Sequence, residues 1–225
     1  MTAAEGHTPM TTTVEFDPDR EAASEWKRER DARYAEARAT RLAAVIPPLF
    51  RDAETDNKAA LAWIAEPTGT LTLTGPVGSG KSHCGWALIR EYMMTKDGLP
   101  KVAGWPLAQL LHYLRPGNAP TRTTAPQWDG GIGGTVTIDI LGTAQDAALL
   151  FLDDVGVERV TDWTAEQVAL IVDHRYTHEL PTIVASNVLP KDLAGVVGDR
   201  IASRWAHNST VIPVTGADRR RRARS

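Results

Sequence analysis

The chain has 225 residues, of which 42% are hydrophobic and 24% are charged. This suits one domain with a sizeable core plus an appendage, and the net charge of −3 does not mark the whole chain as nucleic-acid binding. The single cysteine, Cys84, excludes an intramolecular disulfide and a multi-cysteine zinc site. Because the sequence has neither an 18-residue apolar run nor a signal-peptide pattern, we expect a cytoplasmic protein without membrane contact.

The N-terminal part of the chain is polar and then strongly helical in pattern. Residues 1–16 are small, polar and rich in threonine, and we expect them to be disordered. Asp17 and Pro18 are typical of a helix start, because Asp caps the helix and Pro suits its first turn. Residues 17–45 are rich in Arg, Glu and Ala with a thin apolar stripe, which predicts one long helix. This helix either lies solvated on the main domain or docks a partner.

After Pro47 breaks this helix, predicted helices and strands alternate along the chain. Helices are predicted over residues 57–67, 82–95, 107–115, 136–147, 164–179 and 199–207, with another opened by Pro190. Strands are predicted over residues 70–75, 101–107, 148–154, 182–187 and 210–216. Residues 116–134 are rich in proline and glycine and predict a long loop. Apolar strands alternating with helices predict an α/β fold with a parallel sheet covered on both faces.

A glycine-rich segment follows the first predicted strand. Residues 75–82 read GPVGSGKS and fit the pattern G-x-x-x-x-G-K-[ST] at every fixed position. Glycines let backbone N–H groups curl around phosphate oxygens, and the next helix points its N-terminus at the anion. Lys81 supplies charge to the β and γ phosphates, and the Ser82 hydroxyl ligates Mg²⁺. The predicted nucleotide-binding residues are Gly75, Pro76, Val77, Gly78, Ser79, Gly80, Lys81 and Ser82.

Polar residues at the ends of two other strands can complete a magnesium-nucleotide site. Asp153 and Asp154 end the apolar run LLFLDD, where burying unpaired charge without a function would be costly. Asp153 is expected to hold the metal through water, and Asp154 to orient or deprotonate the attacking water. Asn187 ends the run TIVASN and either touches the γ-phosphate or water, or acts as a turn or helix-cap residue.

Basic residues gather toward the C-terminus. Arg200 and Arg204 are four apart and share a helix face. They either pair with a surface acid such as Asp199 or reach a phosphate on a neighbouring subunit as an arginine finger. The run from Arg219 to Arg222 either adds affinity for single-stranded DNA or is a solvated tail. Cys84 is expected to be a packing residue.

Six blocks occur together in a family-specific order. IPPLFRDAE, GPVGSGKSH, LLFLDDVGVERVTDW, HELPTIVASN, GDRIASRW and TGADRR follow the order and rough spacing of the DnaC/IstB-type AAA+ ATPases. The chain resembles these helicase loaders and transposase helpers over roughly residues 40–221. The resemblance implies a P-loop NTPase domain with a three-layer αβα fold and a five-stranded parallel sheet over 46–217. It also implies a helical partner-binding segment at 17–45, a basic tail at 218–225 and no full C-terminal lid.

The resemblance also implies roles for single residues. Lys81 and Ser82 belong to the first Walker motif and Asp153 and Asp154 to the second, while an extra helical insertion falls around 108–145. By the same resemblance, Asn187 is the sensor-1 residue and Arg220 the sensor-2 arginine. Arg204 is the arginine finger, with Arg200 beside it. Phe50 would lie near the adenine, and His83 would also contact the nucleotide.

The function implied by the resemblance is ATP-dependent helicase loading. The helical segment would bind a hexameric DnaB-type replicative helicase, and the ATPase domains would form a homo-oligomer that shares ATP at its interfaces. The protein would contact single-stranded DNA, and hydrolysis would release the loader. Asp154 stands where many relatives have Glu, so we expect slow hydrolysis. The alternatives are a transposase helper, a non-hydrolysing ATP switch and a small-molecule nucleotide kinase.

Overall fold

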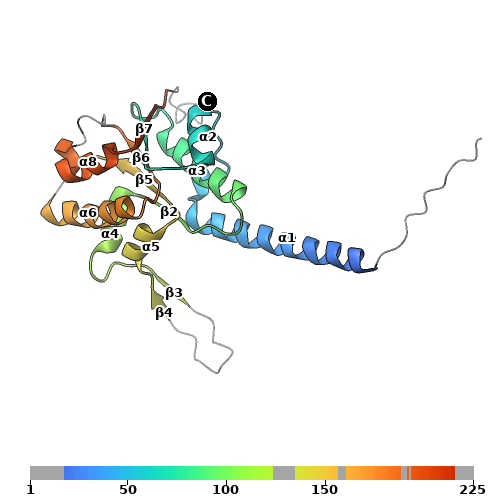
Figure 1. Ribbon diagram of the computed structural model, residues 1–225. Coiled ribbons are helices and arrows are strands. Elements are labelled where there is room, and N and C mark those ends of the chain that lie inside the picture. The colour runs from blue at the N-terminus through green and yellow to red at the C-terminus, as the bar shows by residue number, and fades with distance from the viewer. Residues whose placement is uncertain (1–17, 124–134, 157–160, 189–191, 193, 216–225) are drawn as a thin grey trace, which may run out of the picture.

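A parallel five-stranded sheet forms the centre of the molecule (Figure 1). The computed structural model describes residues 18–123, 135–156, 161–188, 192 and 194–215. In sheet order the strands are β2 (Val102–Pro106), β5 (Leu149–Val155), β6 (Thr182–Ser186), β1 (Thr70–Thr74) and β7 (Ser209–Pro213). All neighbouring strands in this sheet run parallel, which confirms the predicted α/β fold with a central parallel five-stranded sheet.

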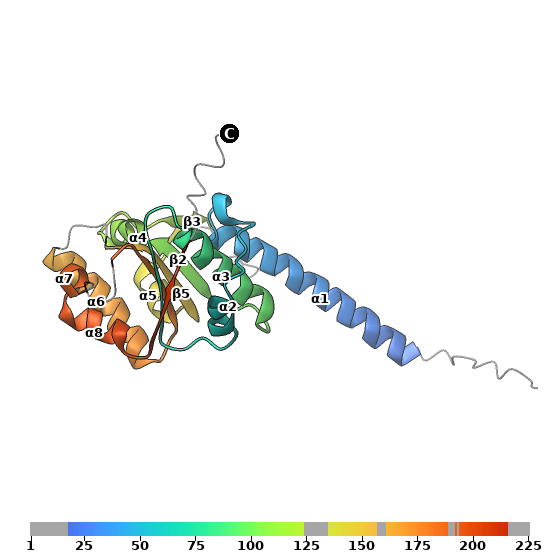
Figure 2. The same ribbon diagram turned by 90° about the horizontal axis from the view of Figure 1, so that it is seen from above.

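Helices cover both faces of the sheet (Figures 1 and 2). One apolar cluster joins the sheet to α1 (Pro18–Val45), α2 (Lys58–Ala65) and α3 (Lys81–Thr95). A second cluster joins the opposite face to α4 (Leu107–Leu114), α5 (Ile140–Asp146), α6 (Asp162–Thr177), α7 (Ala194–Val197) and α8 (Asp199–Ala206). A short 3₁₀ turn, η1 (Pro48–Phe50), connects α1 to α2. The molecule therefore has three layers.

Strand β5 shows why the strands read as continuous apolar runs. Successive side chains of a strand point to opposite faces. Leu149 and Phe151 therefore pack in the cluster under α3, while Leu150 and Leu152 pack in the cluster under α6. All four are almost fully buried. Because both faces of the sheet are covered, no position in this part of the strand favours a polar residue.

Helix α1 extends away from the sheet, and only its C-terminal part lies against the domain (Figures 1 and 2). Two arginines of α1 hold it there. Arg38 donates to the carbonyl oxygens of Met94, Lys96 and Gly98, and Arg41 donates to that of Leu99. These bonds satisfy one carbonyl group in the last turn of α3 and three in the segment that follows it.

The exposed part of α1 carries large apolar side chains. Trp26 is 59% exposed and Tyr34 is 46% exposed. The Arg30 guanidinium lies over the Trp26 ring, with 5.3 Å between Cζ and the ring centroid. The helix is thus solvated over much of its length and lies on the domain only at its C-terminal part, and docking of a partner stays a prediction.

The segment between α4 and α5 differs from the sequence-based expectation. Residues 116–134 were predicted as loop and 136–147 as helix, whereas β3 (Thr121–Thr123) and β4 (Thr135–Thr137) form an antiparallel ladder. Helix α5 starts only at Ile140, after Asp139 caps it by accepting from the Gly142 N–H at 2.9 Å. The β-branched residues of TRT and TVT favour strands once they can pair. The 108–145 region thus holds α4 and α5 with a strand ladder between them.

Several predicted features fall outside the described residues. These are the tail at 1–16, the helix start at Pro190 and the basic tail at 218–225.

None of the helices within the described ranges is long and apolar enough to cross a membrane.

Candidate nucleotide-binding site

The glycine-rich segment links the end of β1 to the start of α3. Gly78 and Gly80 have positive φ angles of 83° and 98°, a region that residues with a Cβ rarely adopt. A Cβ on Gly75 would lie 2.4 Å from the carbonyl oxygen of Val214, so the chain passes too closely there for a larger residue. The glycines of the sequence pattern therefore shape a tight loop at the N-terminus of a 15-residue helix.

Lys81 and Ser79 place polar groups inside this loop. Lys81 is only 6% exposed, and its Nζ donates to the carbonyl oxygens of Gly75 and Pro76, both at 2.9 Å. Ser79 is 4% exposed, and its Oγ has no hydrogen-bond partner among the described residues. A buried orphan hydroxyl and a buried ammonium in a glycine loop fit a phosphate group, because its oxygens accept hydrogen bonds from both.

Ser82 and Asp153 meet across the gap between α3 and β5. The Ser82 Oγ donates to the Asp153 Oδ1 at 3.0 Å, and the backbone N–H of Asp154 donates to the same oxygen at 2.9 Å. Burial raises the pKa of Asp153 to about 6, although the hydrogen bond from Ser82 opposes that rise. A hydroxyl and a carboxylate side by side are oxygen ligands of the kind that Mg²⁺ prefers, so these residues fit the metal.

Asp154 occupies an irregular point at the end of β5. Its φ is +54°, and the pairing register of β5 with β6 shifts between Leu152 and Val155. Aspartate tolerates this left-handed conformation better than most residues with a Cβ. The shift lets both Asp153 and Val155 stay buried while the side chain of Asp154 is exposed. The irregularity therefore presents one acid inward and the next outward.

Asn187 lies at the same edge of the sheet as the glycine loop. It directly follows β6, whose last residue, Ser186, pairs with Thr74 immediately before Gly75. Asn187 is exposed, whereas Ser186 is fully buried and donates to the carbonyl oxygen of Val155 at 2.7 Å. The strand end thus places the amide of Asn187 in solvent.

Phe50 and His83 lie beside the first turns of α3. Their ring centroids are 6.5 Å apart in an edge-to-face arrangement, and Phe50 also stacks on Trp86 at 6.3 Å. His83 Nε2 lies 3.1 Å from the carbonyl oxygen of Glu54. The segment predicted to lie near the adenine therefore packs against the helix that starts at the loop. Cys84 is 5% exposed and belongs to the core, as expected.

The comparisons with known proteins give a short sequence match and several similar folds. No protein-family model matches the chain. A 54-residue segment, 24% of this chain, is 35% identical to the replicative helicase loader DnaI of Bacillus subtilis (strain 168) and spans 17% of that protein. The crystal structure of the DnaC helicase loader matches with a TM-score of 0.59 and 19% identity, covering 75% of this chain and 100% of that one. The chain has the fold of the DnaC helicase loader.

A solved structure with a bound nucleotide analogue has a similar fold. The replication initiator DnaA, bound to AMPPCP and single-stranded DNA, matches with a TM-score of 0.53 and 20% identity. The match covers 75% of this chain and 50% of that chain. The resemblance of the six sequence blocks to DnaC-type AAA+ proteins is thereby confirmed at the level of the fold.

Two predicted AAA+ residues lie away from the glycine loop. Arg200 and Arg204 of α8 both contact Asp173 of α6, at 2.5 Å and 2.7 Å. The acid named as a possible partner, Asp199, is not the one that pairs with them. The contact of Arg204 Nε with Asp173 Oδ1 is an ion pair without the alignment of a hydrogen bond. Arg220 lies outside the described residues.

Asp173 and Arg175 are two residues that sequence reasoning missed. Asp173 lies 27 positions before Arg200, so no local pattern links them. Arg175 is 2% exposed, and burial lowers its pKa to about 9. It donates to Thr182 Oγ1 and to carbonyl oxygens at the end of α5 and before β6, which ties α6 to its neighbours. Its partners are all part of the scaffold, so we assign Arg175 to stability.

Proposed function

We propose that this chain is an ATP-dependent helicase loader that binds a DnaB-type replicative hexamer and delivers it to single-stranded DNA. The observation that carries the proposal is the 3.0 Å hydrogen bond from Ser82 to Asp153. It brings a hydroxyl and a carboxylate together at the end of a glycine loop, within a fold that matches the whole of a DnaC helicase loader structure. The weak similarity to DnaI supports the same assignment.

The residues around the loop divide the work of binding and hydrolysis. The loop amides, Ser79 and Lys81 bind the phosphates, while Ser82 and Asp153 hold Mg²⁺. The metal, when bound, neutralises negative charge on the phosphates. Asp154 is exposed at the same edge and orients the water that attacks, and Asn187 contacts that water or the γ-phosphate. Asp154 is one methylene shorter than Glu, so turnover is expected to be slow.

Partner binding is assigned to the two ends of the molecule. The projecting part of α1, with exposed Trp26 and Tyr34, binds the helicase. The ATPase domains assemble with ATP between subunits. We place ATP there because Arg204 lies away from the loop of its own chain. DnaA, an AAA+ neighbour, is seen with single-stranded DNA, and we propose the same ligand for this chain in the cytoplasm. Hydrolysis then releases the loader.

The first test removes the ammonium of Lys81. Hydrogen bonds to charged groups contribute about 1.5–3 kcal/mol, so Lys81→Ala should weaken binding of a fluorescent ATP analogue by roughly 10- to 100-fold and abolish hydrolysis. Lys58→Ala is the matched control, because Lys58 is exposed on α2. Equal affinity of the two variants for the ATP analogue would contradict the assignment of the glycine loop as the nucleotide site. Wild-type protein that binds ATP but shows no turnover, with or without single-stranded DNA, supports a non-hydrolysing switch instead.

The second test identifies the partner. The chain should co-purify with the replicative helicase from the same source, more strongly with ATP than without it. The Lys81→Ala variant should lose the ATP-dependent part of this binding. Retention of a transposase in place of the helicase would favour a transposition helper, and phosphorylation of a small nucleotide without any partner would favour a kinase.

A further inference from the structure

One carboxylate, that of Asp173 on α6, binds two arginines of α8. Arg200 Nη2 lies 2.5 Å from Asp173 Oδ2, and Arg204 Nε lies 2.7 Å from Oδ1. Each arginine therefore uses a different oxygen of the same acid. The side chain of Arg200 is 68% exposed, whereas those of Arg204 and Asp173 are 28% and 26% exposed. The better shielded ion pair is the one to Arg204, and it is screened less by salt.

Arg204 is also held by an aromatic ring. Its Cζ lies 5.6 Å from the ring centroid of Tyr176, which in turn meets His207 edge-to-face at 5.4 Å. The guanidinium thus has the acid beside Nε and its Cζ over the Tyr176 ring. Neither contact requires Nη1 or Nη2, the two outer nitrogens that can bind an anion as a fork.

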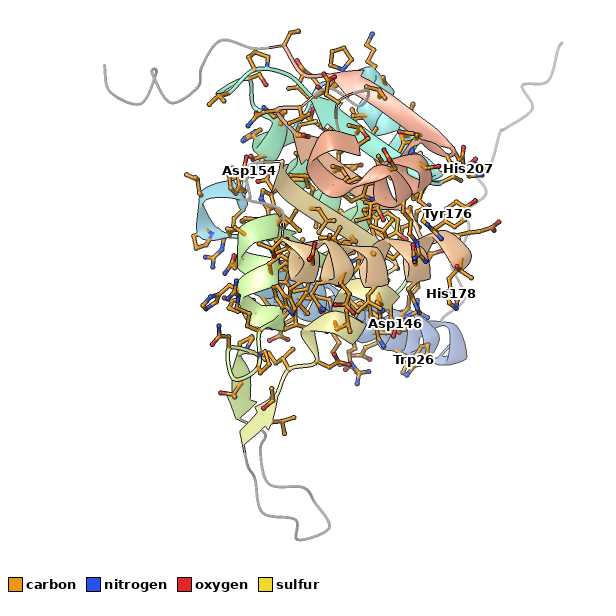
Figure 3. All side chains as sticks on the ribbon, turned by 90° about the vertical axis from the view of Figure 1, so that its left-hand side faces the viewer. Trp26, Asp146, Asp154, Tyr176, His178 and His207 are labelled. Atoms are coloured by element: carbon orange, nitrogen blue, oxygen red, sulfur yellow. The ribbon has the colours of Figure 1, made fainter. Side chains whose placement is uncertain are left out.

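Arg204 cannot serve the nucleotide of its own chain. It lines a cavity of about 510 Å³ together with Thr70 and Thr182, the first residues of β1 and β6. The glycine loop follows the other end of β1, and the five residues of that strand put ~13 Å between its two ends. Figure 3 shows Tyr176 and Asp154 on opposite sides of the molecule. Arg204 therefore lies away from the glycine loop of its own chain.

We propose that Asp173 is a positioning residue for hydrolysis in trans. It holds Arg204 through Nε so that the outer edge of the guanidinium points at the γ-phosphate bound by the neighbouring subunit. Donors that are already oriented stabilise developing charge without reorganisation. This inference rests on the proposed function, since it requires ATP at the subunit interface. It adds that Asp173, on α6 of the same chain, orients Arg204, and no sequence motif marks this acid.

The test compares three substitutions on α6 of the full chain. Asp173→Asn removes the charge, Asp173→Glu keeps it one methylene further out, and Glu166→Gln is the control because Glu166 is exposed on the same helix. ATP turnover of the assembled protein should fall roughly 10- to 100-fold in Asp173→Asn, because small misplacements of a catalytic group cost that much. Asp173→Glu should lie between this variant and wild type. Affinity for a fluorescent ATP analogue and the melting temperature report on binding and folding.

A mixing experiment separates positioning from a purely structural role. Asp173→Asn has an intact glycine loop, and Lys81→Ala has an intact Asp173–Arg204 pair. In mixed oligomers the first can bind ATP while the second supplies the finger, so the mixture should turn over ATP faster than either variant alone. If Asp173 affected only the nucleotide site of its own subunit, mixing would recover no turnover, and that result overturns the inference.

The outcomes also separate this inference from the proposed function. Absence of turnover in wild type overturns both. Loss of turnover in Arg204→Ala with normal turnover in Asp173→Asn overturns only the role of Asp173. If Asp173→Asn does not fold, the decision passes to Asp173→Glu, where wild-type turnover overturns the inference and reduced turnover with unchanged ATP affinity supports it.

Discussion

At the scale of single residues, Asp153 is buried, although its proposed role in holding Mg²⁺ requires a charged carboxylate. Burial raises its pKa from the ordinary value of 3.8 to about 6. The folded protein therefore holds this proton more tightly than the unfolded chain. The resulting contribution to the free energy of unfolding is complete below about pH 4 and is lost as the pH rises through 6. At pH 8 without metal, the ionised carboxylate costs about 3 kcal/mol.

We predict that Asp153→Asn removes this pH dependence. The amide keeps an acceptor for Ser82 without a charge, so the metal-free variant should be more stable than wild type at pH 8, and this advantage should shrink toward pH 4. Urea unfolding at several pH values, with EDTA present, measures the difference. Asp52→Asn, which alters an exposed carboxylate, is the control and should follow wild type. A constant difference across the range contradicts the assigned pKa.

At the scale of secondary-structure elements, the contact between α3 and β5 positions the glycine loop. Gly85 of α3 lies directly on the ring of Phe151, and a Cβ there would be 2.2 Å from the ring. The close approach lets Ser82, one turn earlier in the helix, reach Asp153 at the end of β5. Because Gly85 has no side chain, α3 lies close enough to β5 for Ser82 to contact Asp153.

Gly85→Ala should separate these elements. Overpacking in a core costs about 1–3 kcal/mol, so we expect the free energy of unfolding to fall by that amount and nucleotide affinity to fall with it. Gly195→Ala is the control, because Gly195 also lies in a helix and no atom of the described residues comes within 4 Å of the place that its Cβ would take. That variant should be neutral or slightly stabilised. Equal stability of the two variants would show that α3 tolerates a larger spacing.

At the scale of the whole molecule, α3 connects the nucleotide site to the helix assigned to the partner. It begins at the glycine loop, and the carbonyl groups at and after its last turn accept hydrogen bonds from Arg38 and Arg41 of α1. Helix α1 is therefore fixed at one end of α3 and free at its own N-terminal end (Figure 2). Helix α3 therefore links the glycine loop to α1 directly.

The double substitution Arg38→Ala and Arg41→Ala should release α1. We expect amide hydrogen exchange in its C-terminal half to rise by about tenfold, because four hydrogen bonds to the domain are lost, while the affinity for ATP stays unchanged. Lys27→Ala with Arg28→Ala is the matched control, since both residues are exposed on the projecting part. Unchanged protection of α1 would show that its apolar contacts alone hold it in place.

Local patterns in the sequence determined the alternating helices and strands, the glycine loop and the two acids at the end of β5. These features depend on neighbours within a few residues, where glycine geometry and continuous apolar runs leave few alternatives. The same reasoning missed the strands Thr121–Thr123 and Thr135–Thr137, since segments as short as TRT and TVT form strands only when they pair with each other. Tertiary structure alone decided that α1 docks through Arg38 and that Asp173 pairs with both arginines. Strand order and helix packing bring these side chains together, and neither is encoded in the spacing of residues along the chain.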